Sequence, residues 1–357
     1  MAKGSTIEGI QYLRGIAAMM VVFHHVRHVF GDVSGWTTFG GTGVDIFFVI
    51  SGFIMVYMTP LSRCTMSERL SNMSRFWLKR VVRIVPLYWI ALPLSVVVFK
   101  INLTDPRLIN DFLFFPRFNS QFPAEIWPAL IPGWSINYEM FFYLIFGLSI
   151  LFSSRRLLVA ALIIMTLGIV GSYRQFDSAA MRFYTSTIMF EFLFGMLLFS
   201  LWRYLSAAGA VRYRWVWWVS LLAGFAMLAV NLPGPGFLVH GLPAVFIVLG
   251  AIFAFEGIHI PPLRILGDAS YSIYLFHLLS FAISWHVVSK LRLSATDPHD
   301  LIPVFAIYVV VAAGAGIVLH HLLEKPLVRT GNALIKRFDR PHKEGATMQQ
   351  ATGNATS

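Results

Sequence analysis

The chain has 357 residues, of which 57% are hydrophobic and 13% are charged, and its mean hydropathy is +0.69. Soluble domains carry about 25% charged residues, so this composition excludes an ordinary soluble protein and predicts a polytopic helical membrane protein. The net charge of +11 does not indicate nucleic-acid binding, because the basic residues are spread between apolar segments, as the positive-inside rule explains. The single cysteine, Cys64, excludes an intrachain disulfide.

Ten apolar segments are long enough to cross a bilayer, and they predict an all-α bundle of about ten transmembrane helices. With the N-terminus in the cytoplasm, the inner segments carry more than twice as many Lys and Arg residues as the outer ones, which predicts a cytoplasmic C-terminus as well. The long outer segment 100–133 is too apolar for a disordered linker, so we expect it to lie over the membrane mouth. The ten segments are residues 10–30, 42–59, 81–99, 134–152, 157–172, 184–202, 215–231, 237–256, 269–289 and 302–323.

The first segment contains charged and titratable residues that a membrane helix tolerates poorly. An ionisable side chain inside a bilayer costs roughly 2.5 kcal/mol or more, so a functional role is its default interpretation. At 100° per residue, Arg14 and His25 lie about 20° apart around a helix and about 16 Å apart along it. His24 falls off this line. Arg14 and His25 are therefore predicted to face one cavity at two depths.

Polar residues also interrupt the next three segments. Asp45 opens the second segment. Arg80 and Arg83 share a helix face at the inner end of the third and suit a phosphorylated ligand, although basic residues flank the inner ends of membrane helices in any case. Glu139, about one and a half turns into the fourth segment, either orients an acceptor hydroxyl or forms a structural ion pair. Glu191 is interpreted as a structural partner.

The ninth and last segments add further polar groups. Ser270, Tyr274 and His277 are spaced i, i+4, i+7 and so lie on one helix face. Taken singly, His277 is more simply explained as a buried structural histidine. His320 and His321 point about 100° apart on a helix and cannot chelate as a pair, so no metal site is expected.

These motifs, in this order, resemble the membrane acyltransferase 3 family. The similarity covers nearly the whole chain, up to about residue 330. His24 stands where relatives often carry an aromatic residue, so helix phase is what favours His25. The matching segments are LRGIAA at 13–18 running to His25, GVDIFFVISGF at 43–53, Arg80 with Arg83, Trp134 and Ser135 with Glu139, SYSIYL at 270–275 with His277, and EKP at 324–326.

The resemblance implies an enzyme of the bacterial inner membrane that moves an acetyl group from cytoplasmic acetyl-CoA to a hydroxyl of an extracytoplasmic glycan. The acceptor would be an exopolysaccharide, a lipopolysaccharide or a lipid-linked oligosaccharide, met beside membrane lipid. Residues 1–335 would form the transmembrane acyltransferase domain, and residues 336–357 a disordered cytoplasmic tail. No metal cofactor is implied.

Histidine has a pKa near 6.5, so His25 is predicted to be the general base for the acceptor hydroxyl. The predicted catalytic set is His25, Arg14, Asp45 and Glu139, and the predicted donor-binding set is Arg14, Arg80, Arg83, Ser270, Tyr274 and His277. Two alternatives remain open. The same chemistry would acylate a lipid, peptidoglycan or a small metabolite, and a proton-coupled transporter would also use intramembrane Arg, His and Glu residues.

Overall fold

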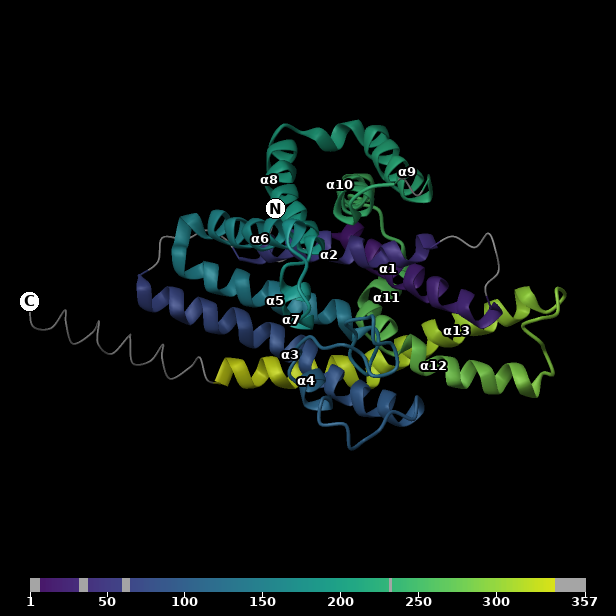
Figure 1. Ribbon diagram of the computed structural model, residues 1–357. Helices are drawn as coiled ribbons and strands as arrows, with labels where there is room; N and C mark the ends of the chain where they lie inside the picture. Colours follow the sequence, from purple (N-terminus) through teal and green to yellow (C-terminus); the bar gives the residue numbers. More distant parts are fainter. Residues whose placement is uncertain (1–6, 32–37, 60–64, 231–232, 338–357) are drawn as a thin grey trace, which may run out of the picture.

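The computed structural model describes residues 7–31, 38–59, 65–230 and 233–337, and within these ranges the chain is helical with no strands (Figure 1). The longer helices are α1 Glu8–Val26, α2 Gly43–Met58, α3 Met66–Val98, α5 Gly133–Ser149, α6 Arg156–Tyr173, α8 Phe190–Ala207, α9 Arg214–Val230, α10 Leu242–Ala254, α12 Ser270–Lys290 and α13 Leu301–Leu319. The shorter ones are η1 Arg27–Phe30, η2 Thr38–Thr42, α4 Leu108–Phe112, η3 Ile150–Arg155, α7 Ala179–Tyr184, η4 Thr187–Met189, η5 Ala210–Tyr213, η6 Phe237–Gly241, α11 Pro261–Asp268 and η7 His320–Glu324.

The prediction of an all-α membrane protein is confirmed, since eight helical segments of the described chain are long and apolar enough to cross a bilayer. All ten predicted ranges fall on helices, but the count differs at two places. Helix α1 is not among the eight, and its 19 residues include Glu8, Arg14 and two histidines. Helices α5 and α6 count as one segment, Gly133–Tyr173, although Ser153 interrupts it with φ 51° and ψ −114°. Ten crossings and cytoplasmic termini therefore stay predictions.

Two helix ends differ from the sequence prediction. Helix α3 begins at Met66 rather than near residue 81, because Thr65 and Glu68 form a capping box in which each side chain bonds the other's backbone N–H. Its first turns are polar, so hydropathy does not reveal them. At the C-terminal end of the described chain, residues 336 and 337 are helical, although they belong to the predicted tail. The rest of that tail, 338–357, lies outside the described residues.

Close contacts between small residues bring the helices together. Gly52 of α2 meets Gly195 of α8, and Gly15 of α1 meets Gly267 of α11. A larger side chain at these positions would collide with the backbone of the facing helix, as in other membrane proteins that pack through small residues. Helix α1 contacts α2, α10, α11, α12 and α13, so it joins helices from the beginning of the described chain to helices near its end.

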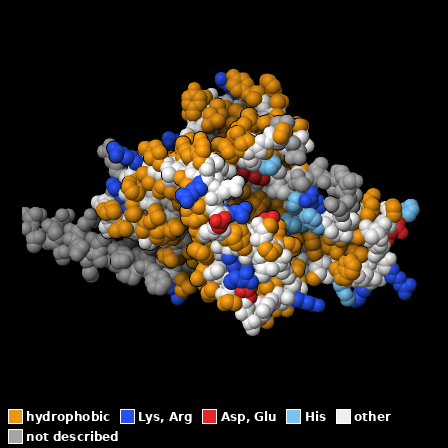
Figure 2. All heavy atoms as spheres, in the orientation of Figure 1, with side chains coloured by type: hydrophobic (Ala, Val, Ile, Leu, Met, Phe, Trp, Pro, Cys, Tyr) orange, Lys and Arg blue, Asp and Glu red, His pale blue; other side chains and the backbone are white. Residues whose placement is uncertain are grey.

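The helices form an elongated bundle in which α3, α5 and α6 lie toward one end and α12 and α13 toward the other (Figure 1). Helices α8, α9 and α10 stand together on one side of α1 and α2. Hydrophobic side chains cover most of the face shown in Figure 2, as a surface in contact with lipid requires.

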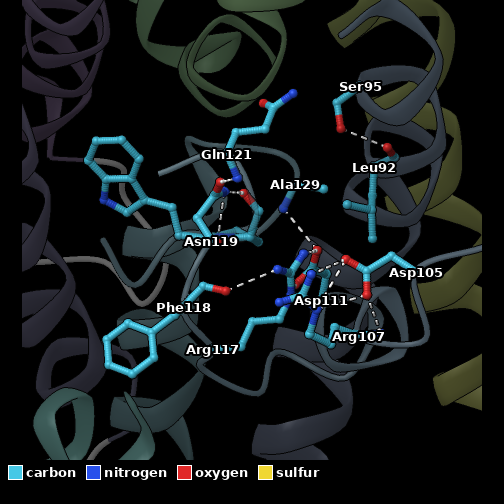
Figure 3. A network of polar contacts seen from close by, with 12 residues as sticks. Leu92, Ser95, Asp105, Arg107, Asp111, Arg117, Phe118, Asn119, Gln121 and Ala129 are labelled. Carbon is cyan, nitrogen blue, oxygen red and sulfur yellow. Dashed lines mark hydrogen bonds and ion pairs between the residues drawn. The ribbon is translucent and has the colours of Figure 1, made fainter. Parts of the chain in front are cut away.

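The segment between α3 and α5 is fixed by a buried ion pair (Figure 3). Asp111 is fully buried and accepts hydrogen bonds from Nε and Nη2 of Arg117, both at 2.7 Å, and from the backbone N–H of Ala129 at 2.8 Å. The side chain of Asn119 accepts from the backbone of Gln121 at 2.8 Å. The segment is thus an ordered part of the fold, and its place over the membrane mouth stays a prediction.

Candidate active site

A narrow cavity of about 80 Å³ lies where α1, α2, α3, α5 and α12 meet. The rest of its wall is mostly apolar and includes Phe47 and Phe48 of α2. Residues that are far apart in the sequence therefore converge on one place. Six of the nine predicted site residues line the cavity: Arg14, Arg80, Arg83, Glu139, Ser270 and Tyr274.

Arg14 enters the cavity from α1. Its Nη1 lies 3.5 Å from Oε1 of Gln11, one turn earlier on the same helix. The charged groups acting on it include the cation Arg83 and the carboxylates Glu324 and Glu139. Together with the third arginine of the cavity, the positive charges outnumber these carboxylates. The cavity therefore suits a ligand with negative charge.

Glu139 is held in the cavity wall by two hydroxyl groups. Oγ of Ser51, on α2, donates to Oε1 of Glu139 at 3.0 Å, and the hydroxyl of Tyr143, one turn further along α5, donates to the same oxygen. The Arg80 guanidinium lies 5.6 Å from the centroid of the Tyr143 ring, within cation–π range. This position is compatible with orienting a substrate hydroxyl and with balancing the arginines.

The α12 residues form the opposite wall. The hydroxyl of Tyr274 lies 2.6 Å from Oγ of Ser135 and donates to the backbone oxygen of Pro132 at 3.1 Å. This contact ties α12 to the start of α5. Oγ of Ser270 is buried in the cavity and makes no hydrogen bond to any described part of the chain, so it can serve a ligand.

His25 and His277 form a separate pair, with His277 Nε2 3.2 Å from His25 Nδ1. His277 Nδ1 lies 2.6 Å from the backbone oxygen of Tyr274, and His25 Nδ1 lies 2.9 Å from that of Val21. Carbonyl oxygens only accept, so both Nδ1 atoms carry hydrogen, and the one Nδ1–H of His25 is shared between the Val21 oxygen and Nε2 of His277. Nε2 of His25 then keeps its lone pair, which is the tautomer that a general base needs.

The histidine pair does not line the arginine cavity. Arg14 and His25 lie on one unbroken helix, as their predicted separation in depth requires. Tyr274 connects the two places, since its side chain lines the cavity and its carbonyl oxygen bonds His277. His277 contacts the proposed base, and its donor-binding role stays a prediction. The ring of His24 lies against Gly41, on η2.

Asp45 also lies outside the cavity, in the first turn of α2. Its neighbours include the carboxyl group of Glu191 on α8, which is 1% exposed, and His240. Asp45 thus belongs to a buried carboxyl pair, and its catalytic role rests on the sequence pattern.

Sequence reasoning gave no role to Glu324, although an acidic residue in an apolar segment is itself a signal. Glu324 is buried, accepts from Oγ of Ser272 at 2.6 Å, and lies 2.9 Å from Nδ1 of His320. The turn that carries it, His320–Glu324, is a π-helix, a form that often occurs at functional sites. Glu324 is one of the two carboxylates beside Arg14.

The chain matches the family model described as an acyltransferase domain over residues 7–321. It is 35% identical over 321 residues to the exopolysaccharide production protein ExoZ of Rhizobium meliloti (strain 1021), covering 83% of this chain and 92% of that protein. It is 25% identical over 370 residues to the O-acetyltransferase OatA of Staphylococcus aureus (strain NCTC 8325 / PS 47), covering 91% of this chain and 58% of OatA. The peptidoglycan O-acetyltransferase OatA of Listeria monocytogenes serovar 1/2a is 24% identical over 313 residues, 76% of this chain and 49% of that protein. No solved structure shows significant similarity.

Proposed function

The chain belongs to the acyltransferase 3 family and is a membrane O-acetyltransferase, and from this premise we propose that it acetylates an extracytoplasmic glycan with cytoplasmic acetyl-CoA. The bacterial inner membrane is the proposed location. The exopolysaccharide production relative, at 35% identity, favours an exopolysaccharide or a lipopolysaccharide as acceptor.

One observation carries the proposal: polar residues from α1, α3, α5 and α12 converge on a cavity inside a bundle of apolar helices. A low-dielectric surrounding strengthens the action of fixed charges on a bound ligand. Arg80 and Arg83, at the end of the cavity proposed to face the cytoplasm, suit the donor phosphates. His25 is proposed to face the acceptor.

The proposed reaction uses the lone pair on Nε2 of His25. This atom takes the proton of the acceptor hydroxyl while the hydroxyl oxygen attacks the thioester carbonyl carbon. A C–O bond forms, the C–S bond breaks, and the departing sulfur takes the proton from the imidazolium. Transfer through an acetyl-imidazole would use the same residue as nucleophile.

Because they lie at different depths, the residues of the site are proposed to have different roles. Arg14 and His25 are about 16 Å apart along α1, so they cannot act on the same oxygen atom. In our proposal Arg14, with Arg80 and Arg83, holds the donor, and the thioester is threaded past Tyr274 toward His25. Glu139 balances this positive charge.

The test is acetyl transfer from radiolabelled acetyl-CoA to a lipid-linked oligosaccharide in membranes. His25→Ala should lower the rate by about two to four orders of magnitude, the contribution of a general base. His24→Ala, the matched neighbouring change, should be much milder, and both variants should reach wild-type membrane levels. A wild-type rate in His25→Ala would end the assignment. If the label appeared only in a lipid or a metabolite, that molecule would replace the glycan as the proposed acceptor. Transport of a substrate without a covalent product would indicate a transporter.

A further inference from the structure

A second cavity, of about 240 Å³, lies beside the first between α3, η3 and the start of α6. Its described lining contains five basic residues and no Asp or Glu. Apart from Arg80, which was predicted to bind the donor, the sequence alone gave these positions no role beyond orienting the chain in the membrane. The basic residues are Arg69, Arg75, Lys79, Arg80 and Arg156.

The long helix α3 supplies four of these cations. Arg69, Asn72 and Arg80 are spaced i, i+3, i+11 and so lie on one helix face. The same face continues to Arg83, fourteen residues from Arg69 and about 21 Å along the axis at 1.5 Å per residue. Arg80 lines both cavities. The stripe therefore leads from the second cavity into the first.

Backbone carbonyl groups hold two of the guanidinium groups in place. Nη1 of Arg69 donates to the backbone oxygen of Leu151 at 3.1 Å, and Nη2 of Arg156 donates to that of Thr59. Arg156 is 5% exposed. Carbonyl oxygens thus orient these two side chains, and arginine forks bind phosphate through paired donors.

We propose that this second cavity binds the phosphate-bearing nucleotide end of the coenzyme A donor, while the first cavity takes its pantetheine arm. This inference rests on the proposed function, since it assigns a subsite of the same donor. The 3′-phosphate and the pyrophosphate carry several negative charges, which suit a cavity whose described lining holds five basic residues. The stripe on α3 then sets the direction of the arm, from Arg69 toward Arg83 and the proposed reaction site.

The experiment measures binding of coenzyme A and of 3′-dephospho-coenzyme A to the full chain in phosphatidylcholine nanodiscs by titration calorimetry. Wild type should bind coenzyme A more tightly than the dephospho form. Lys79→Gln, at an exposed position, and Arg156→Gln should each weaken coenzyme A binding about tenfold or more, the loss expected for a charge-assisted hydrogen bond. The matched control is Arg155→Gln, an exposed neighbour outside the cavity lining, which should bind as wild type does.

Other outcomes separate the two levels of the proposal. If wild type binds and transfers from acetyl-CoA but Lys79→Gln and Arg156→Gln keep wild-type affinity, the cavity assignment is overturned and the proposed function stands. If wild type binds no coenzyme A at all, the donor in the proposed function fails as well. Phosphatidylglycerol nanodiscs test the other source of phosphate: a lipid preference that these variants abolish, with coenzyme A affinity unchanged, would assign the cavity to a lipid headgroup and overturn the donor subsite.

Discussion

Arg117→Ala removes the cation from the buried ion pair between α3 and α5. Asp111 is 0% exposed and receives three hydrogen bonds, two of them from Arg117. In the variant, the N–H of Ala129 would be the one donor left to Asp111 within the described residues. Removing one partner of a buried ion pair costs about 3–5 kcal/mol, because the other charge stays buried without compensation. We therefore expect the free energy of locally opening the segment between α3 and α5 to fall by about 3–5 kcal/mol.

The measurement is native-state hydrogen exchange at the amide of Ala129, which bonds Asp111 directly. A loss of about 3–5 kcal/mol in opening free energy should speed its exchange by roughly two to four orders of magnitude. The control is Arg107→Ala, which breaks an ion pair with Asp105 in the same segment. In that pair the Arg107 side chain is 53% exposed. Water replaces that contact, so a much smaller change is expected. Equal exchange at Ala129 in the two variants would refute the reasoning.

Two further predictions concern the site and its orientation. His277→Phe removes the acceptor that orients the proposed base, so kcat should fall roughly tenfold, the value of one hydrogen bond, with the donor KM unchanged; a change confined to the donor KM would instead support the donor-binding role. In a Cys64→Ser background, a cysteine at Ser120 should react with an impermeant thiol reagent from outside, whereas cysteines at Ser71 and Ser154 should not. Outside labelling at Ser71 would reverse the proposed orientation.

The fold could be predicted from the sequence wherever apolar segments were long enough. All ten predicted ranges fall on helices because hydrophobic length marks a membrane helix without reference to its neighbours. The first turns of α3 were missed because they are polar, and a capping box rather than hydropathy sets their start. The break at Ser153 was also invisible, since a single residue with positive φ leaves no apolar or charged pattern.

The site could be predicted in part for the same reason. Charged residues in apolar helices almost always face the interior of the bundle, because exposure to lipid is costly. Six of the nine predicted residues accordingly meet in one cavity. The pairing of His25 with His277 was not predictable, because it depends on how α1 and α12 cross. The second cavity was missed because its basic residues other than Arg80 also satisfy the positive-inside rule, so each has a sufficient explanation without a ligand.

Tyr274 is held at both ends: its hydroxyl bonds Ser135 and the backbone of Pro132, and its carbonyl oxygen bonds His277. A protein that passes an acetyl group across a bilayer, as proposed, must not conduct protons or ions along the same route. The ring of Phe47 lies 5.8 Å from that of Tyr274, and both rings line the cavity. On this proposal, the two aromatic rings would limit the passage of water and ions along the route of the acetyl group. Smaller residues at Phe47 and Tyr274 are expected to let protons or ions leak across the membrane and lower the membrane potential, even in variants that still acetylate the acceptor.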